Sequence, residues 1–213
     1  MLFQLVKKDF VLVKKYVLIM ITVSIIFPLL LIGRLPEYAG VMGFVLITII
    51  SVFMLLQYVF LKETQYPKAS ALLCALPYPR KDIALSKYIF CLIIYLVCCM
   101  IFGIEALVFP QLGTWGFTMP VVLFLVISIL LSIYLPVQYK LGYEKTKFLF
   151  VIIIMTFSFG LPQFLKVENN LDFSFLDMLN PTILLGGAIL FSIIILVVSA
   201  MISMRIYKKT DLL

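Results

Sequence analysis

An all-α integral membrane protein is the fold class that this sequence predicts, and two observations predict it. Of the 213 residues, 64% are hydrophobic and only 13% are charged, whereas soluble domains contain about 25% charged residues. The mean hydropathy is +1.21, and the hydrophobic residues gather into long uninterrupted stretches. A helix needs about 20 hydrophobic residues to cross a bilayer core of about 30 Å. We therefore predict a single transmembrane domain over residues 1–213.

Each of the long hydrophobic stretches is predicted to form one membrane-spanning helix, which gives six spans. In the first of them, Pro28 is expected to kink the helix without ending it, because neighbouring helices can satisfy the freed carbonyl group. The predicted spans are residues 16–33, 41–61, 89–109, 120–138, 148–164 and 183–204.

The basic residues predict the direction of each span. Lys and Arg gather on the cytoplasmic side of membrane proteins. When the segments between spans are assigned alternately to the two sides, 15 of the 17 basic residues fall on one side, and only Arg34 and Lys166 fall on the other. The basic side holds Lys7, Lys8, Lys14, Lys15, Lys62, Lys68, Arg80, Lys81, Lys87, Lys140, Lys145, Lys147, Arg205, Lys208 and Lys209. We therefore predict that both termini, residues 62–88 and residues 139–147 are cytoplasmic.

Residues 1–15 are predicted to form an amphipathic helix that lies along the inner membrane surface. Hydrophobic residues recur there at helical spacing between four lysines, namely Leu2, Leu5, Val6, Phe10 and Val13. A positively charged start that only orients the first span is the alternative, and the lysines can serve both roles.

The composition also argues against several functional classes. The chain has no His, which is the commonest general base and metal ligand, and no pairing of a nucleophile with a base is visible, so we expect no catalytic residues. The 4 Cys residues have no metal-ligand spacing, so no metal site is expected. The net charge is +7, but the cations lie at the ends of hydrophobic stretches, so nucleic acid is not an expected partner.

The cytoplasmic loop 62–88 is predicted to contain a second short helix. Its centre, residues 69–76, is almost entirely small or apolar, and a helix of about 12 Å is too short to cross the bilayer. Pro77 and Pro79 would end this helix. Asp82 is expected to cap the helix that continues into the third span.

This short helix can either lie among lipid headgroups or insert into a groove of a soluble partner. In the second interpretation, leucines enter the partner and charged residues form a polar rim around the contact. The leucines are Leu72, Leu73 and Leu76, and the charged residues are Glu63, Lys68, Arg80, Lys81 and Asp82.

Two stretches of the chain resemble ABC-2 type transporter permeases. The sequence LLCALPYPRKDIALSKY at residues 72–88 is similar to their segment in which a short hydrophobic helix precedes Leu-Pro-x-x-Arg-Lys and a Lys-Tyr pair enters the next helix. The basic end ISMRIYKKTDLL at residues 202–213 resembles the way in which they leave their sixth span. Among these permeases, a short chain without a large outer domain resembles exporters of amphipathic peptides, such as phenol-soluble-modulin or lantibiotic-immunity transporters.

The resemblance implies a permease subunit of the bacterial cytoplasmic membrane, paired as a homodimer or heterodimer with a second permease. ATP-binding-cassette ATPase subunits would dock on residues 62–88 and drive export of an amphipathic or hydrophobic peptide, such as a toxin or antimicrobial peptide, or of a lipid-like molecule. This chain lacks the phosphate-binding pattern G-x-x-x-x-G-K-[ST]. We therefore expect ATP and Mg²⁺ on the partner ATPase, and neither a cofactor nor an enzymatic activity on this chain. The alternative is a non-transporting membrane scaffold or sensor that recruits a soluble partner through the same loop.

Three polar residues in the predicted spans are candidates for a translocation path. Glu105 is the only acid inside a hydrophobic stretch, and intramembrane carboxylates are often functional. About 27 Å of helix separates it from Lys87, so a simple position at the outer interface is the alternative. Thr156 and Ser158 lie on the fifth span, which the resemblance implies is near the two-fold axis of a dimer. Helix packing is the alternative for these two residues.

Overall fold

The computed structural model describes residues 2–33, 39–66, 79–112, 116–167 and 181–209. Within these ranges the regular structure is helical and no strand occurs. The elements are α1 (Leu2–Leu12), α2 (Lys14–Ile32), α3 (Ala39–Gln65), α5 (Arg80–Val108), the 3₁₀ helix η1 (Pro110–Leu112), α6 (Thr118–Leu141), α7 (Tyr143–Val167) and α9 (Pro181–Lys209). The prediction of an all-helical protein is therefore confirmed for the described residues.

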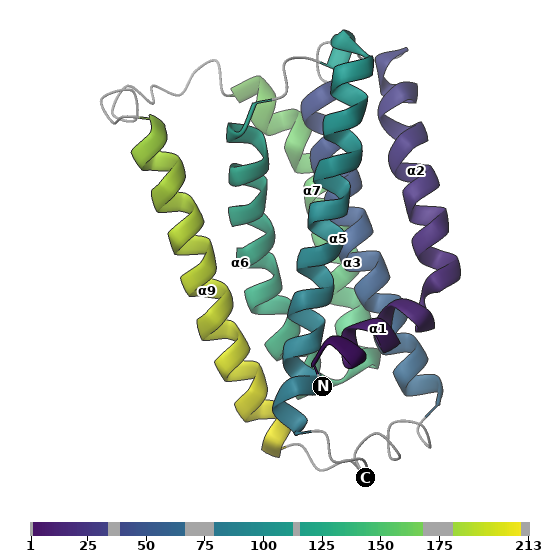
Figure 1. Cartoon of the computed structure of the whole chain (residues 1–213), viewed down its shortest axis with the longest axis vertical. Helices are drawn as coiled ribbons and strands as arrows, with labels where there is room; N and C mark the ends of the chain where they lie inside the picture. Colours follow the sequence, from purple (N-terminus) through teal and green to yellow (C-terminus); the bar gives the residue numbers. More distant parts are fainter. Residues whose placement is uncertain (1, 34–38, 67–78, 113–115, 168–180, 210–213) are drawn as a thin grey trace.

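The long helices run side by side along one axis, whereas α1 lies across that axis at one end of the bundle (Figure 1). α6 packs along α9, α2 packs on α3, and α5 contacts α1, α3 and α9. α7 packs against α3 and α6. Because α1 contacts α5 more extensively than it contacts the helix after it in the chain, its position is set by tertiary packing.

Among the described residues, five helices are long and apolar enough to cross a membrane: α2, α3, most of α5, α6 and most of α9. They cover five of the predicted spans, and α2 continues through Pro28 as expected. α7 covers the remaining predicted span, residues 148–164, but it is not among these five helices. The chain is thus a multi-pass membrane protein, and the sixth crossing stays a prediction, as does the position of α1 at a membrane surface.

α3 is the central helix of the bundle. Two thirds (67%) of its apolar window is buried, against at most 33% in the other four candidate spans. Val52, Phe53 and Leu56 of α3 have no exposed surface. The other helices leave large apolar side chains on their outer faces, among them Leu18 of α2 and Leu190 of α9. Exposed apolar surface on this scale suits contact with lipid or with another membrane subunit.

Hydrogen bonds between side chains join neighbouring helices inside the bundle. Gln57 of α3 donates to the hydroxyl of Tyr134 on α6 at 2.7 Å. The Tyr88 hydroxyl of α5 lies 2.7 Å from Ser199 Oγ and 2.8 Å from Ser203 Oγ on α9. Such bonds between membrane helices each contribute about 0.6 kcal/mol on average. They help to fix how α3 and α6, and α5 and α9, are placed against one another.

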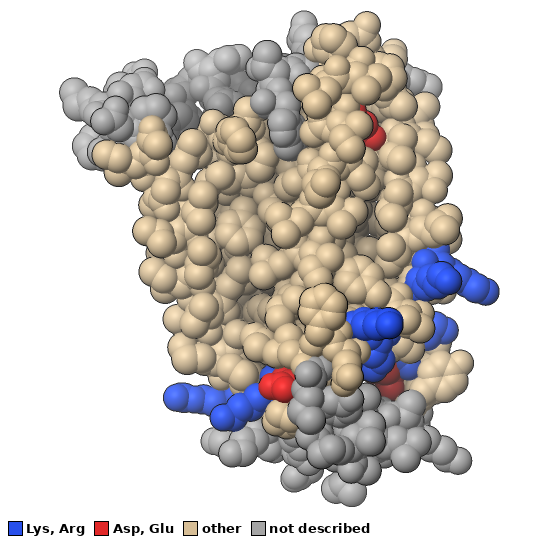
Figure 2. Space-filling model, in the orientation of Figure 1, with Lys and Arg blue, Asp and Glu red and all other residues tan. Residues whose placement is uncertain are grey.

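Basic residues gather toward the end of the bundle at which α1 lies (Figure 2). We call this end, which contains α1, the carboxyl end of α3 and the start of α5, the basic end. The grouping is the arrangement that the positive-inside rule describes. The assignment of the basic end to the cytoplasm stays a prediction.

The helix after the loop begins earlier than the sequence indicated. α5 starts at Arg80, and its N-cap residue is Pro79, without a side-chain cap hydrogen bond. The expectation that Asp82 caps this helix is therefore wrong. Asp82 lies in the first turn of α5, where a carboxylate interacts favourably with the positive end of the helix dipole. Residues 69–76, predicted to form the short helix, lie outside the described residues.

The first turn of α3 makes a close approach to η1 that depends on glycine. A Cβ atom at Gly40 would clash with the backbone carbonyl oxygen of Leu112. We expect Gly40→Ala to lower the free energy of unfolding in detergent micelles by about 1–3 kcal/mol, because backbone must shift to admit the methyl group. Gly187→Ala on α9 is the control, since a Cβ there meets nothing within 4 Å. Equal stability of the two variants would contradict this close approach.

Candidate functional site

Charged side chains at the basic end join three segments that are far apart in the sequence. Lys87 Nζ on α5 lies 2.9 Å from Asp9 Oδ1 on α1 and 2.6 Å from Glu63 Oε1 on α3. Lys8 Nζ on α1 lies 2.9 Å from the same Glu63 oxygen and 3.2 Å from Asp9 Oδ1. We call Lys8, Asp9, Glu63 and Lys87 the charge cluster.

The charge cluster is half inside the protein. The side chains of Asp9 and Lys87 are 0% and 1% exposed, whereas those of Glu63 and Lys8 are 25% and 27% exposed. Two cations face two anions, so the formal charge of the cluster is zero. The Ser86 hydroxyl, 3.4 Å from Asp9 Oδ2, lies beside the buried carboxylate. Burying a charge costs several kcal/mol unless its partners have good geometry, and here each buried charge has at least two polar neighbours.

Helical periodicity places Asp9 and Lys87 on the buried faces of their helices. On α1, Leu5 and Val6 are buried, and Asp9 comes four and three residues after them, so it lies on the same face. On α5, the buried residues Ile83 and Ala84 precede Lys87 by the same spacings. Each charged side chain therefore continues the buried stripe of its own helix, and the two stripes meet at the cluster.

An exposed ion pair on α7 can be compared with the partly buried charge cluster. Lys147 and Glu144 of α7 lie one helical turn apart, with 2.8 Å between Nζ and Oε2, and both side chains are exposed. The hydrogen bond from Lys147 to Glu144 raises the pKa of the Lys147 ammonium group above its ordinary value. Exposed pairs of this kind contribute little to stability. The charge cluster differs because it connects three helices and keeps two of its charges away from solvent.

The structure describes only some of the eight residues that were predicted to contact a partner. Glu63 belongs to the charge cluster. Lys81 is exposed in the first turn of α5 and Asp82 is half-buried beside it, and Arg80 begins α5, although its side chain is not described. Four further predicted residues lie outside the described part of the chain: Lys68, Leu72, Leu73 and Leu76. The role of all eight residues in binding a partner stays a prediction.

Three members of the charge cluster are not identified by the sequence as site residues. From the sequence, Lys8 has a role only in topology, Lys87 has a role in topology and in the Lys-Tyr pair of the permease-like segment, and Asp9 carries no assignment. A signal for Asp9 exists, because it is an acid at helical spacing from Leu5 on the apolar side of a predicted amphipathic helix. No pattern in the sequence indicates its buried partner Lys87, which lies 78 positions further along the chain.

The candidates for a translocation path lie on two helices. Glu105 of α5 is only 7% exposed, and neither of its carboxylate oxygens has a hydrogen-bond partner among the described residues. Thr156 of α7 is exposed, and its hydroxyl donates to the carbonyl oxygen of Ile152 at 2.8 Å. Ser158 lies on the same helix, but its side chain is not described. No hydrogen bond in the described structure brings Glu105 and Thr156 together, and a common path stays a prediction.

The described part of the chain contains no candidate metal site, and its cysteines are free thiols. No group of three or more Cys, Asp or Glu residues there is placed to hold a metal ion. Cys91 and Cys98 are buried within the bundle and Cys99 is half-buried. These cysteines act as small apolar side chains in the packing between helices.

Removal of the buried cation tests the charge cluster. In Lys87→Met, Asp9 keeps its charge without its main partner, so we expect the free energy of unfolding to fall by about 3–5 kcal/mol. The double variant Asp9→Leu with Lys87→Met removes both charges, and we expect it to recover most of that loss. Lys145→Met, at an exposed position on α7, should be close to neutral. A double variant no more stable than Lys87→Met would contradict this account; denaturant titration in micelles measures all three.

Comparison with known proteins identifies the family. A family described as ABC-2 family transporter protein matches residues 4–208, a range that contains the charge cluster and the loop between α3 and α5. Neither the curated proteins nor the solved structures gave a match. The chain therefore belongs to the ABC-2 transporter family, whose members are membrane subunits that work with ATP-binding-cassette ATPases.

Proposed function

We propose that this chain is the permease subunit of an ATP-binding-cassette exporter in a bacterial cytoplasmic membrane, with both termini in the cytoplasm. The family match, the five apolar helices and the gathering of cations at one end support this assignment. The observation that carries the proposal is the charge cluster. It joins α1 to both of the helices that flank residues 67–78, the central part of the loop on which ATPase subunits would dock.

The charge cluster gives a physical route from the loop to the membrane. A displacement of the loop by a docked ATPase would act on the carboxyl end of α3 and on the start of α5. Lys87 ties these two ends together through Glu63 and ties both to α1 through Asp9. Since a separated pair would leave a charge buried without a partner, the three segments are expected to move together. ATPase motion would then reach the membrane as a rigid-body displacement of several helices.

ATP and Mg²⁺ bind, in this proposal, to the ATPase subunits, and this chain supplies the docking surface. The exposed Lys81 and half-buried Asp82 at the start of α5 stand beside the loop and are suited to a polar rim. Together with Arg80, Glu63 and the loop residues Lys68, Leu72, Leu73 and Leu76, they form the proposed contact. A second permease, identical or different, would complete the transporter.

The proposed substrate is an amphipathic or hydrophobic peptide, or a lipid-like molecule. The bundle is apolar for most of its length. Glu105 lies outside the basic end, and its buried carboxylate has no hydrogen-bond partner among the described residues. A carboxylate in this state would be stabilised by a cationic group of a passing substrate. Glu105, with Thr156 and Ser158 of α7, is therefore our proposed contact set along the path.

A non-transporting scaffold or sensor is the alternative function, since it would use the same loop to recruit a soluble partner. The two functions differ in the step after the partner has bound. A permease must change the ATPase rate of its partner when substrate is present, whereas a scaffold only needs to hold the partner. Reconstitution of the chain with its ATPase in proteoliposomes, with and without candidate peptides, separates the two functions.

Charge reversal at the start of α5 tests the docking surface. We expect the double variant Arg80→Glu with Lys81→Glu to weaken ATPase binding and peptide-stimulated ATP hydrolysis by about tenfold or more, because two contacts across an interface change from attraction to repulsion. Lys140→Glu with Lys145→Glu is the control, since it makes the same change of charge at exposed positions near the turn between α6 and α7. Binding and hydrolysis that both stay intact in the first variant would refute the docking assignment.

Neutralisation of Glu105 tests the path. Glu105→Gln keeps the shape of the side chain and removes its charge. We therefore expect ATP-driven uptake of a cationic amphipathic peptide into inverted vesicles, which corresponds to export from the cell, to fall about tenfold, the loss of one hydrogen bond to a charged group. ATPase binding should not change. Glu144→Gln, at an exposed carboxylate on α7, should export normally. Normal export by Glu105→Gln would remove Glu105 from the path.

A further inference from the structure

A network of buried hydroxyl groups joins three helices beside the charge cluster. The Tyr88 hydroxyl on α5 lies 2.7 Å from Ser199 Oγ and 2.8 Å from Ser203 Oγ on α9. The Ser199 hydroxyl donates to the backbone carbonyl oxygen of Ser132 on α6 at 3.0 Å. Tyr88, Ser199 and Ser203 are all buried. We call these four residues the hydroxyl network, and the function proposed above does not use it.

The direction of each hydrogen bond in the hydroxyl network follows from the carbonyl group at its end. A carbonyl oxygen can only accept, and a hydroxyl group has one proton to donate. Because Ser199 gives its proton to Ser132, Tyr88 donates to Ser199. The proton of Tyr88 is then used, so Ser203 donates to the Tyr88 oxygen. A shift of α9 along α5 would therefore leave buried polar groups without partners, which is unfavourable.

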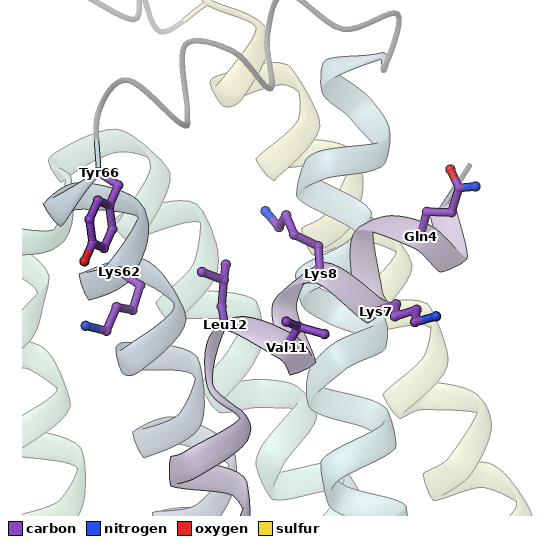
Figure 3. A pocket seen from close by; sticks show the side chains of 7 residues that line it. All are labelled: Gln4, Lys7, Lys8, Val11, Leu12, Lys62 and Tyr66. Atoms are coloured by element: carbon purple, nitrogen blue, oxygen red, sulfur yellow. The ribbon is translucent and has the colours of Figure 1, made fainter.

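Tyr88 directly follows Lys87, but the two side chains reach different helices. Successive residues on an α-helix lie about 100° apart around its axis. Lys87 contacts Asp9 of α1 and Glu63 of α3, in the region where α1 lies beside the carboxyl end of α3 (Figure 3). Tyr88 contacts α9, whose carboxyl end lies near the start of α5 (Figure 1). Two neighbouring residues thus connect the start of α5 to different parts of the bundle.

The helix that Tyr88 contacts is closely packed on another one. Among the described helices, α6 and α9 share the most extensive contact. The buried residues in the described part of α9 are all small, namely Ser192, Ser199, Ala200 and Ser203. Small residues let membrane helices approach closely, so α6 and α9 are expected to move as a pair. Apolar contacts alone hold this pair against α5 weakly, because lipid tails offer the same contacts.

We propose that Tyr88 is the positioning residue that couples the start of α5 to the pair of α6 and α9. This role rests on the exporter function proposed above. When an ATPase displaces the loop, Lys87 keeps α1 and α3 with α5, and Tyr88 keeps α9, and with it α6, in register with α5. Without the tyrosine hydroxyl, ATP is hydrolysed in cycles in which α6 and α9 do not follow, so less substrate is exported for each ATP.

Tyr88→Phe tests this role, since it removes only the hydroxyl group. The measurement uses inverted vesicles that contain the chain and its ATPase, with a labelled amphipathic peptide of leucine and lysine as the probe. We expect ATPase binding and the rate of ATP hydrolysis to stay at wild-type levels. The peptide taken up per ATP hydrolysed should fall about eightfold, because two hydrogen bonds are lost and each corresponds to a factor of about 2.8.

Tyr95→Phe is the matched control. It removes a hydroxyl group of the same helix that also bonds to α6, at 2.6 Å from the carbonyl oxygen of Pro120, but that lies about 10 Å further along α5 from the loop. We expect this variant to keep wild-type uptake per ATP. Ser203→Ala removes one of the two bonds of Tyr88 from the side of α9. It should lower uptake per ATP about threefold and cause no further loss in combination with Tyr88→Phe.

Several results would overturn the proposal. Wild-type uptake per ATP in Tyr88→Phe would remove Tyr88 from the coupling and leave the exporter function standing. An equal loss in Tyr95→Phe would show that uptake follows the general stability of the bundle. Loss of ATPase binding in Tyr88→Phe would assign Tyr88 to the docking surface instead. Wild-type vesicles without ATP-driven uptake would contradict the exporter function itself, and with it this role; that failure appears before any variant is compared.

Discussion

The ammonium group of Lys87, which has almost no contact with solvent, is the constraint on which the basic end depends. A buried cation without partners is costly by several kcal/mol, so the fold has to bring anions to it from elsewhere in the chain. Asp9 comes from α1 and Glu63 comes from α3. α1 cannot leave the bundle without exposing its buried apolar face and removing one of the two carboxylates that contact this cation. For that reason α1 is part of the bundle.

The kind of polar contact between helices differs along the bundle. Between the spans, contacts such as Gln57 with Tyr134 are single hydrogen bonds, which are individually weak in membranes. At the basic end, the charge cluster ties three segments at one point. In the coupling proposed above, the loop acts on α3 and α5 through this cluster.

The sequence could predict most of the fold because the bilayer imposes it. Long apolar stretches indicate the positions of five candidate spans within a few residues at most ends. At α5 the helix was expected to continue from Asp82 into the third span, and it begins two residues before Asp82, at Arg80, with Pro79 as the N-cap residue. The charge cluster was out of reach because it depends on how α1 and α3 pack against α5. Asp9 alone, as an acid on an apolar face, could have been suspected.

A distance between α1 and α3 in the working transporter tests this account most directly. Spin labels at the exposed positions Phe3 and Thr64, in a chain whose cysteines are replaced, report that distance by pulsed electron resonance in the complex with its ATPase. The account predicts one narrow distribution that stays unchanged when ATP is bound and hydrolysed, and a broad distribution in Lys87→Met. A wild-type distance that broadens or shifts with ATP, or a variant as narrow as the wild type, would contradict it.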